Sequence, residues 1–139
     1  MLGPPTERPK LLSGGAGLYS TAGDYLRFAR MLCDGSLDGA RIMKPETARA
    51  MREDQLEGRP VSGPMAAMLR DGFGLGVALI REPGRAGQPD SVGCGWVGAA
   101  GTSFWVDPDH GIAGVFLTQT WTRLDMGAAF QREAYAALH

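Results

Sequence analysis

The chain of 139 residues contains no asparagine, only two cysteines and only two lysines. Without asparagine there is no acceptor for N-glycosylation. Cys33 and Cys94 are interpreted as small buried side chains rather than as a disulfide. Fourteen Lys and Arg residues against 15 Asp and Glu residues give a net charge of −1. Because there is no basic excess, we expect no nucleic-acid partner.

Long hydrophobic runs are also absent. The longest strongly apolar run lies within residues 112–117, far below the ~20 residues that a transmembrane helix needs. The first residues have neither the basic nor the apolar region of a signal peptide. We therefore expect no membrane partner, and the sequence leaves the compartment undetermined.

Glycine, in contrast, is abundant. Its 21 residues are about twice the average share of ~7%. The apolar fraction of 44% and the charged fraction of 21% are those of a folded globular protein. The glycine excess therefore predicts tight turns and close backbone contacts rather than disorder.

The first part of the chain is predicted to be helical. Residues 1–12 contain three prolines and little periodicity, and we interpret them as a linker. A Gly-rich turn then leads into a helix with an apolar stripe, which Ser20 or Thr21 can cap and which Gly35 ends. This helix opens a predicted helical part, residues 13–71.

A second helix is predicted to start near Pro45 and to run through residues 46–52. Residues 53–71 are polar and rich in turn formers, which predicts a surface loop with a helical turn at 65–69.

Three strands are predicted after this loop. Large apolar residues alternate with small ones over residues 72–80, which is typical of a strand. Residues 93–98 lead into a second strand at 102–106. A tight turn separates it from a third strand at 112–119, so the last two strands should form an antiparallel hairpin.

The remaining segments are a predicted loop at 82–91 and a C-terminal helix that Thr122 can cap and that continues to Leu138. Residues 72–139 are therefore predicted to be a sheet followed by one helix. Helices followed by an antiparallel sheet indicate an α+β fold, in which the last helix is free to cover one face of the sheet.

Most sequence motifs of cofactor and metal sites are absent or lack the surroundings that they require. Residues 93–98 match the dinucleotide fingerprint G-x-G-x-x-G, but a strand follows where the fingerprint requires a helix. His110 and His139 have no histidine or cysteine at ligand spacing, so we expect no metal site. We expect no cofactor, and interpret His110 as a solvated residue of a turn.

The nucleophile motifs of serine hydrolases are missing as well. No Gly-x-Ser-x-Gly elbow occurs. A Ser-x-x-Lys pair is excluded at both lysines, because Glu7 precedes Lys10 by three residues and Arg41 precedes Lys44 by three.

One segment, residues 96–101, has a possible chemical role. If it is extended, Trp96 and Gly98 point to one face, and the glycine lets a ligand approach the backbone closely. The N–H of Ala99 can then donate a hydrogen bond to a developing oxyanion. The alternative is a Gly-rich entry to a strand, with Trp96 filling the core.

Taken in order, several segments resemble the later half of the serine β-lactamase-related hydrolases, which include class C β-lactamases, D-alanyl-D-alanine peptidases and β-lactamase-fold esterases. The resemblance extends from about residue 13 to the C-terminus and rests on residues 13–25, 37–42, 45–47, 72–76, 95–102 and 104–108.

In this family a Ser-x-x-Lys motif, a tyrosine of a Tyr-x-Asn type motif and a third motif on a sheet strand form the active site. Trp96, Val97 and Gly98 match the esterase-like form of the third motif. The resemblance implies that Trp96 and Gly98 line the acyl pocket and that the Ala99 N–H is one of two oxyanion donors.

The chain departs from the family pattern at several points. It has neither the nucleophile nor its lysine, and a Tyr-x-Asn motif is impossible without asparagine. Lys44 stands where relatives often have serine, so the cap of the second helix should be weak. We therefore expect no catalytic residue in this chain.

The resemblance implies the C-terminal portion of a β-lactamase-like α+β fold. It would supply the third-motif wall of an esterase or amidase whose N-terminal segment carries the nucleophile. The substrate would be a small ester or amide. The alternative is a non-catalytic module that binds a ligand or pairs with another subunit, or with itself, through an exposed sheet edge.

Overall fold

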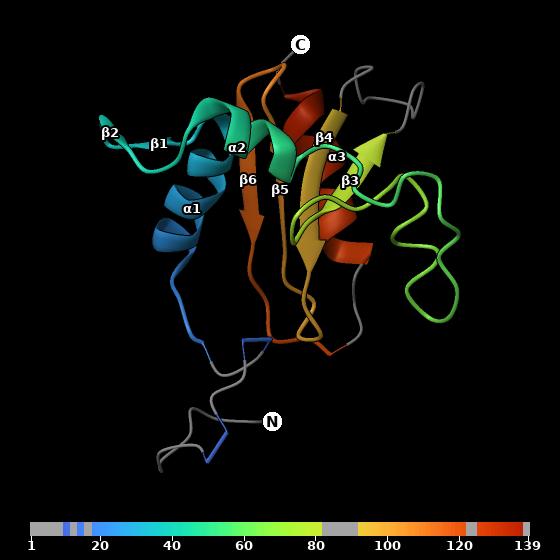
Figure 1. Ribbon diagram of the computed structural model, residues 1–139. Coiled ribbons are helices and arrows are strands. Elements are labelled where there is room, and N and C mark those ends of the chain that lie inside the picture. Colours follow the sequence, from blue (N-terminus) through green and yellow to red (C-terminus); the bar gives the residue numbers. More distant parts are fainter. Residues whose placement is uncertain (1–9, 12–13, 16–17, 82–91, 122–124, 138–139) are drawn as a thin grey trace.

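The computed structural model describes residues 10–11, 14–15, 18–81, 92–121 and 125–137. A four-stranded antiparallel sheet lies between helix α1 on one face and helix α3 on the other (Figure 1). The predicted α+β class is confirmed. None of the described helices is long and apolar enough to cross a membrane.

Helix α1 spans Ala22–Asp34 and begins and ends as its sequence predicts. The Thr21 side chain, rather than that of Ser20, caps it by accepting the N–H of Asp24 at 3.1 Å. Gly35 ends the helix with φ 82°, a left-handed conformation that glycine adopts without strain.

Two short strands, β1 (Ser36–Leu37) and β2 (Ala40–Arg41), form a hairpin where the sequence predicts only a link. Helix α2 spans Pro45–Met51, close to the predicted range. Its cap is weak as expected, because the Lys44 side chain makes no capping hydrogen bond. The predicted helical turn is present, since the Leu69 N–H donates to the Met65 carbonyl at 3.1 Å.

The sheet has the strand order β3-β4-β5-β6. The strands are β3 (Ala78–Arg81), β4 (Val92–Val97), β5 (Ser103–Asp107) and β6 (Ile112–Phe116). The prediction of three strands was therefore wrong, because β4 is a full strand rather than a lead-in. The predicted hairpin of the second and third strands is confirmed as β5 and β6.

The predicted strand boundaries were also too wide. The segment 72–77 folds back instead of extending: Phe73 forms a bridge with Ala78, and the Gly74 N–H donates to the Val77 carbonyl at 2.8 Å. Strand β6 ends at Phe116 instead of residue 119.

Helix α3 spans Asp125–Ala136 and covers one sheet face as expected. The Phe130 ring lies 5.6 Å from the Trp105 ring, measured between centroids. Thr122 and Leu138, the predicted ends of this helix, lie outside the described residues, as do the loop 82–91 and most of the predicted linker.

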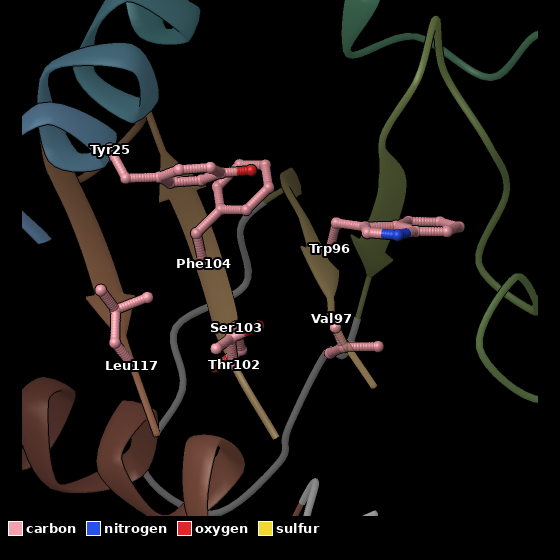
Figure 2. A pocket seen from close by; sticks show the side chains of 8 residues that line it. Tyr25, Trp96, Val97, Thr102, Ser103, Phe104 and Leu117 are labelled. Carbon is pink, nitrogen blue, oxygen red and sulfur yellow. The ribbon is translucent and has the colours of Figure 1, made fainter. Parts of the chain in front are cut away.

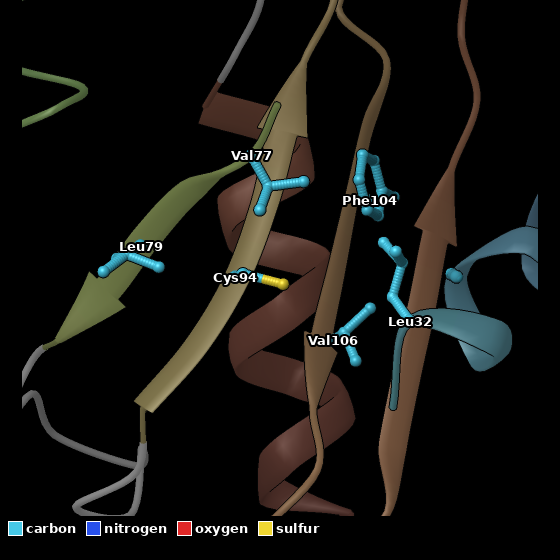
Figure 3. Close-up of a cluster of buried hydrophobic side chains, with 7 residues drawn as sticks. Leu32, Val77, Leu79, Cys94, Phe104 and Val106 are labelled. Carbon is cyan, nitrogen blue, oxygen red and sulfur yellow. The ribbon is translucent and has the colours of Figure 1, made fainter. Parts of the chain in front are cut away.

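The opposite face of the sheet carries the main apolar core. Pairing of β4 with β5 places Cys94 opposite Val106 and Trp96 opposite Phe104 on this face. The buried members of the cluster come from α1, the segment before β3, and strands β3 to β5 (Figure 3): Ala29, Leu32, Val77, Leu79, Cys94, Phe104 and Val106.

Candidate functional site

The third-motif residues lie where β4 ends and turns into β5. Trp96 and Val97 are the last residues of β4. The turn is closed by two hydrogen bonds, from the Gly98 N–H to the Thr102 carbonyl at 2.8 Å and from the Gly101 N–H to the Gly98 carbonyl at 3.0 Å. The segment 96–101 is thus extended at Trp96 and Val97 and forms a turn after Gly98.

Gly98 has a steric reason to be glycine. A Cβ atom there would lie 2.3 Å from the Thr102 Oγ1 atom, far inside van der Waals contact. The next residue, Ala99, is exposed at the tip of the turn. No described residue accepts a hydrogen bond from its N–H, so this donor is available to a ligand.

Trp96 both packs on the core and lines a cavity, the two alternatives that its sequence context leaves open. Its half-buried ring packs against the apolar core and makes an edge contact with Phe73 at 5.8 Å between centroids. The same side chain is one of those that line a small cavity (Figure 2). Gly98 lines this cavity as well.

This cavity has a volume of about 120 Å³ and is mostly apolar. Its lining residues come from α1, β4, β5, the connecting turn and the segment after β6: Tyr25, Trp96, Val97, Gly98, Thr102, Ser103, Phe104 and Leu117. None of these side chains carries a charge at neutral pH. The cavity is therefore suited to an uncharged group.

Beyond the third motif, the sequence does not predict which residues of α1, β5 and the segment after β6 line this cavity, among them Tyr25 and Leu117. Tyr25 was assigned only to the apolar stripe of the first helix, where its spacing gives no sign of a second role. It is half-buried, and burial raises the pKa of its hydroxyl group.

Among the described residues, no serine or cysteine beside this cavity has a partner that would activate it as a nucleophile. The Ser103 Oγ atom is buried on the side of α3, where it faces Gly127 rather than an ionisable partner. Cys33 and Cys94 are free thiols, as expected, but burial raises the pKa of both, that of Cys94 to about 11. Thiols with raised pKa values are poor nucleophiles at neutral pH.

His110 lies in a turn and is exposed, as expected, but it also makes two contacts with Asp107 that the sequence does not predict. Its Nδ1 atom lies 3.0 Å from the Oδ2 atom of Asp107, and its backbone N–H donates to Oδ1 at 3.2 Å. Asp107 is only 1% exposed and also accepts the Tyr135 hydroxyl at 2.7 Å. These contacts join the β5–β6 turn to α3. Among the described residues no group of three His, Cys, Asp or Glu side chains could hold a metal ion.

A family model described as beta-lactamase matches residues 2–138. The chain belongs to the beta-lactamase family. It is 36% identical over 138 residues to Protein Rv1367c of Mycobacterium tuberculosis, and this match covers 93% of the chain. It is 37% identical over 114 residues to Esterase EstB of Burkholderia gladioli, which covers 78% of the chain and 26% of the esterase.

A solved structure of another hydrolase has a similar fold. EstCE1, described as a hydrolase with promiscuous acyltransferase activity, aligns with a TM-score of 0.58 and 31% identity over 79% of this chain and 27% of its own. The chain spans only about a third, 34%, of the length of Rv1367c. It comprises a C-terminal portion of the family fold.

Proposed function

We propose that this chain supplies one wall of an esterase or amidase site of the serine type, and that a separate N-terminal segment supplies the nucleophile. The observation that carries the proposal is the turn after β4. It joins Trp96 and Gly98, which line an apolar cavity, to the Ala99 N–H, a backbone donor with no described partner. The relatives named as an esterase and a hydrolase support the reaction class.

The uncharged lining of the cavity supports small neutral esters or amides as the substrates. A substrate oxygen placed against the turn would accept a hydrogen bond from the Ala99 N–H as negative charge develops on it. A second donor and the attacking hydroxyl would come from the N-terminal segment. The lining of the cavity offers no cation for a substrate carboxylate, which favours esters over β-lactams.

The test measures hydrolysis of p-nitrophenyl acetate and of a chromogenic cephalosporin by the chain alone and with an added N-terminal segment. This segment can be the part of Rv1367c that precedes the matched region, or the product of DNA upstream of this chain if that DNA encodes Ser-x-x-Lys. We expect turnover only in the mixture, with the acetate ester preferred. Turnover by the chain alone, lost when its cavity is altered, would contradict the proposal.

A backbone variant tests the donor itself. Ala99→Pro removes the N–H and should lower kcat of the mixture by about 10²–10³-fold, the usual effect of losing one oxyanion donor. Ala99→Gly keeps the N–H and serves as the matched control, with kcat near that of the parent. Equal rates for the two variants would exclude Ala99 as a donor.

A second candidate function is strand pairing through β6. This strand has β5 as its one partner in the described sheet, so its outer edge presents backbone groups to another strand. We expect a second copy of the chain to pair there at high concentration. Hydrogen exchange should then slow at alternate amides of Ile112–Phe116 as concentration rises. Exchange independent of concentration, with a monomeric mass by light scattering, would reject self-pairing.

A further inference from the structure

The cavity beside Gly98 has one wall that comes from far away in the sequence. Tyr25 reaches from α1 across Phe104 toward the strand that carries Trp96, and Leu117, on the segment after β6, also lines the cavity (Figure 2). Helix α1 thus contributes directly to the space next to the third motif.

The Tyr25 ring is held in place by two other rings. Its centroid lies 5.5 Å from that of Phe28 and 5.2 Å from that of Phe104, and both contacts are edge-to-face. Edge-to-face contacts of this kind stabilise a particular ring orientation. No described residue bonds the Tyr25 hydroxyl. The ring therefore forms a wall with a defined orientation, and no described residue holds its hydroxyl group.

The size of the cavity limits what it can hold. Its volume is about 120 Å³, and it is open to solvent on part of its surface. It is slightly smaller than an engineered cavity of ~150 Å³ that binds benzene. A short, uncharged apolar group fills this space, and the rest of a longer chain would lie outside it without adding buried contact.

We propose that Tyr25 determines specificity by closing the end of the acyl pocket, so that the site selects substrates with a short, uncharged acyl group. Describing the bound group as acyl rests on the proposed function. The length limit itself rests on the cavity and on the position of the Tyr25 ring.

The experiment titrates the chain with a series of methyl ketones from 2-butanone to 2-decanone, followed by the NMR signals of the tryptophan indoles. These ketones carry the carbonyl of an ester and cannot be hydrolysed. For the parent chain we expect affinity to rise about fourfold per methylene among the shortest ketones and then to stop rising.

Three variants test whether Tyr25 sets the ketone length at which affinity stops rising. Tyr25→Leu shortens the wall, so the fourfold rise should continue to longer ketones. Tyr25→Phe keeps the ring and should keep the limit of the parent. Phe28→Leu is the matched control, because Phe28 contacts the same ring cluster but does not line the cavity. The proposal is overturned by an unchanged limit in folded Tyr25→Leu, or by the lack of saturable binding of any ketone.

A parallel assay separates this inference from the proposed function. Hydrolysis of p-nitrophenyl esters of increasing length is measured for the mixture with the N-terminal segment. A length limit in binding without any turnover supports the role of Tyr25 and counts against the proposed function. Turnover with the same length preference in the parent and in Tyr25→Leu refutes the role of Tyr25 and leaves the proposed function standing.

Discussion

At the scale of the residue, Gly114 in β6 lies directly beneath the indole of Trp105 in the neighbouring strand. A Cβ atom at Gly114 would lie 2.1 Å from the Trp105 Cη2 atom, and Trp105 is only 3% exposed. Because the ring also packs on Phe130 of α3, it has little room to move. We expect Gly114→Ala to lower the free energy of unfolding by about 1–3 kcal/mol, measured by urea denaturation.

Gly23 provides the control for this substitution. A Cβ atom at Gly23 would meet only the Thr21 Oγ1 atom, at 3.9 Å, and the residue lies in α1. Gly23→Ala should be neutral or stabilising by up to about 1 kcal/mol, because alanine favours helix. If Gly114→Ala were as stable as Gly23→Ala, the inference that the Trp105 ring leaves no room for a Cβ atom at Gly114 would be wrong.

Asp54 gives a prediction of pH dependence. The backbone N–H groups of Phe73 and Leu56 both donate to its Oδ1 atom at 3.1 Å, and they lower the pKa of this carboxyl below its ordinary value of 3.8. A lowered folded-state pKa contributes stability that is present above pH 3.8 and is lost as the pH falls through the folded-state pKa. Above pH 3.8, Asp54→Asn should therefore unfold at a lower urea concentration than the parent.

The difference between Asp54→Asn and the parent should shrink as the pH is lowered below 3.8. Glu57→Gln, in the same loop, controls for the loss of one negative charge. A difference that stays constant at all pH values would show that the Asp54 contacts do not depend on its charge.

At the scale of the element, the docking of α3 depends on a buried carboxylate. The Tyr135 hydroxyl donates to Asp107, and burial together with this hydrogen bond raises the pKa of Tyr135 well above its ordinary range. The phenol therefore stays protonated and remains a donor at neutral pH. Tyr135→Phe leaves the buried carboxylate with one donor fewer, which should cost about 1.5–3 kcal/mol of unfolding free energy.

Tyr25→Phe is the comparison for this loss of a hydroxyl, because no described residue bonds the Tyr25 hydroxyl. Its unfolding free energy should stay within about 0.5 kcal/mol of the parent. Equal losses for the two variants would mean that the bond to Asp107 adds nothing to the docking of α3.

The elements with the strongest local signals were predicted best. The cap and the terminal glycine of α1 follow from local chemistry, and so does the Pro45 start of α2. Strand β4 was missed because Gly93 and Gly95 interrupt its apolar pattern. The structure explains these glycines, since a Cβ at Gly95 would lie 2.3 Å from the Phe104 carbonyl oxygen. Such a close approach between strands has no local signature.

The candidate site shows the same division between local and long-range information. The order of Trp96, Val97 and Gly98 was readable as a motif, and the turn that presents Ala99 follows it directly. Tyr25 was not readable, because its place in the cavity depends on how α1 packs on β5. Short motifs are therefore visible in the sequence, whereas walls contributed by a distant helix appear only in the fold.

At the scale of the whole molecule, a sheet between two helices leaves large apolar side chains in contact with solvent. Leu18 is 91% exposed, Leu75 51% and Leu117 45%. The chain spans 34% of the length of Rv1367c. If an N-terminal segment completes the site, part of this surface should become covered. If that segment binds the folded state of the chain and not its unfolded state, it would also stabilise the chain by mass action.

We therefore expect the melting temperature of the chain to rise with the concentration of added segment. At one hundred times the dissociation constant the gain is about 2.7 kcal/mol, or roughly 10 °C for a domain of this size. Leu117→Lys, placed at the cavity, should reduce this gain, whereas Met65→Lys in the loop between α2 and β3 should not. A melting temperature independent of the added segment would count against completion from outside the chain, and equal gains for both lysine variants would place the contact away from the cavity.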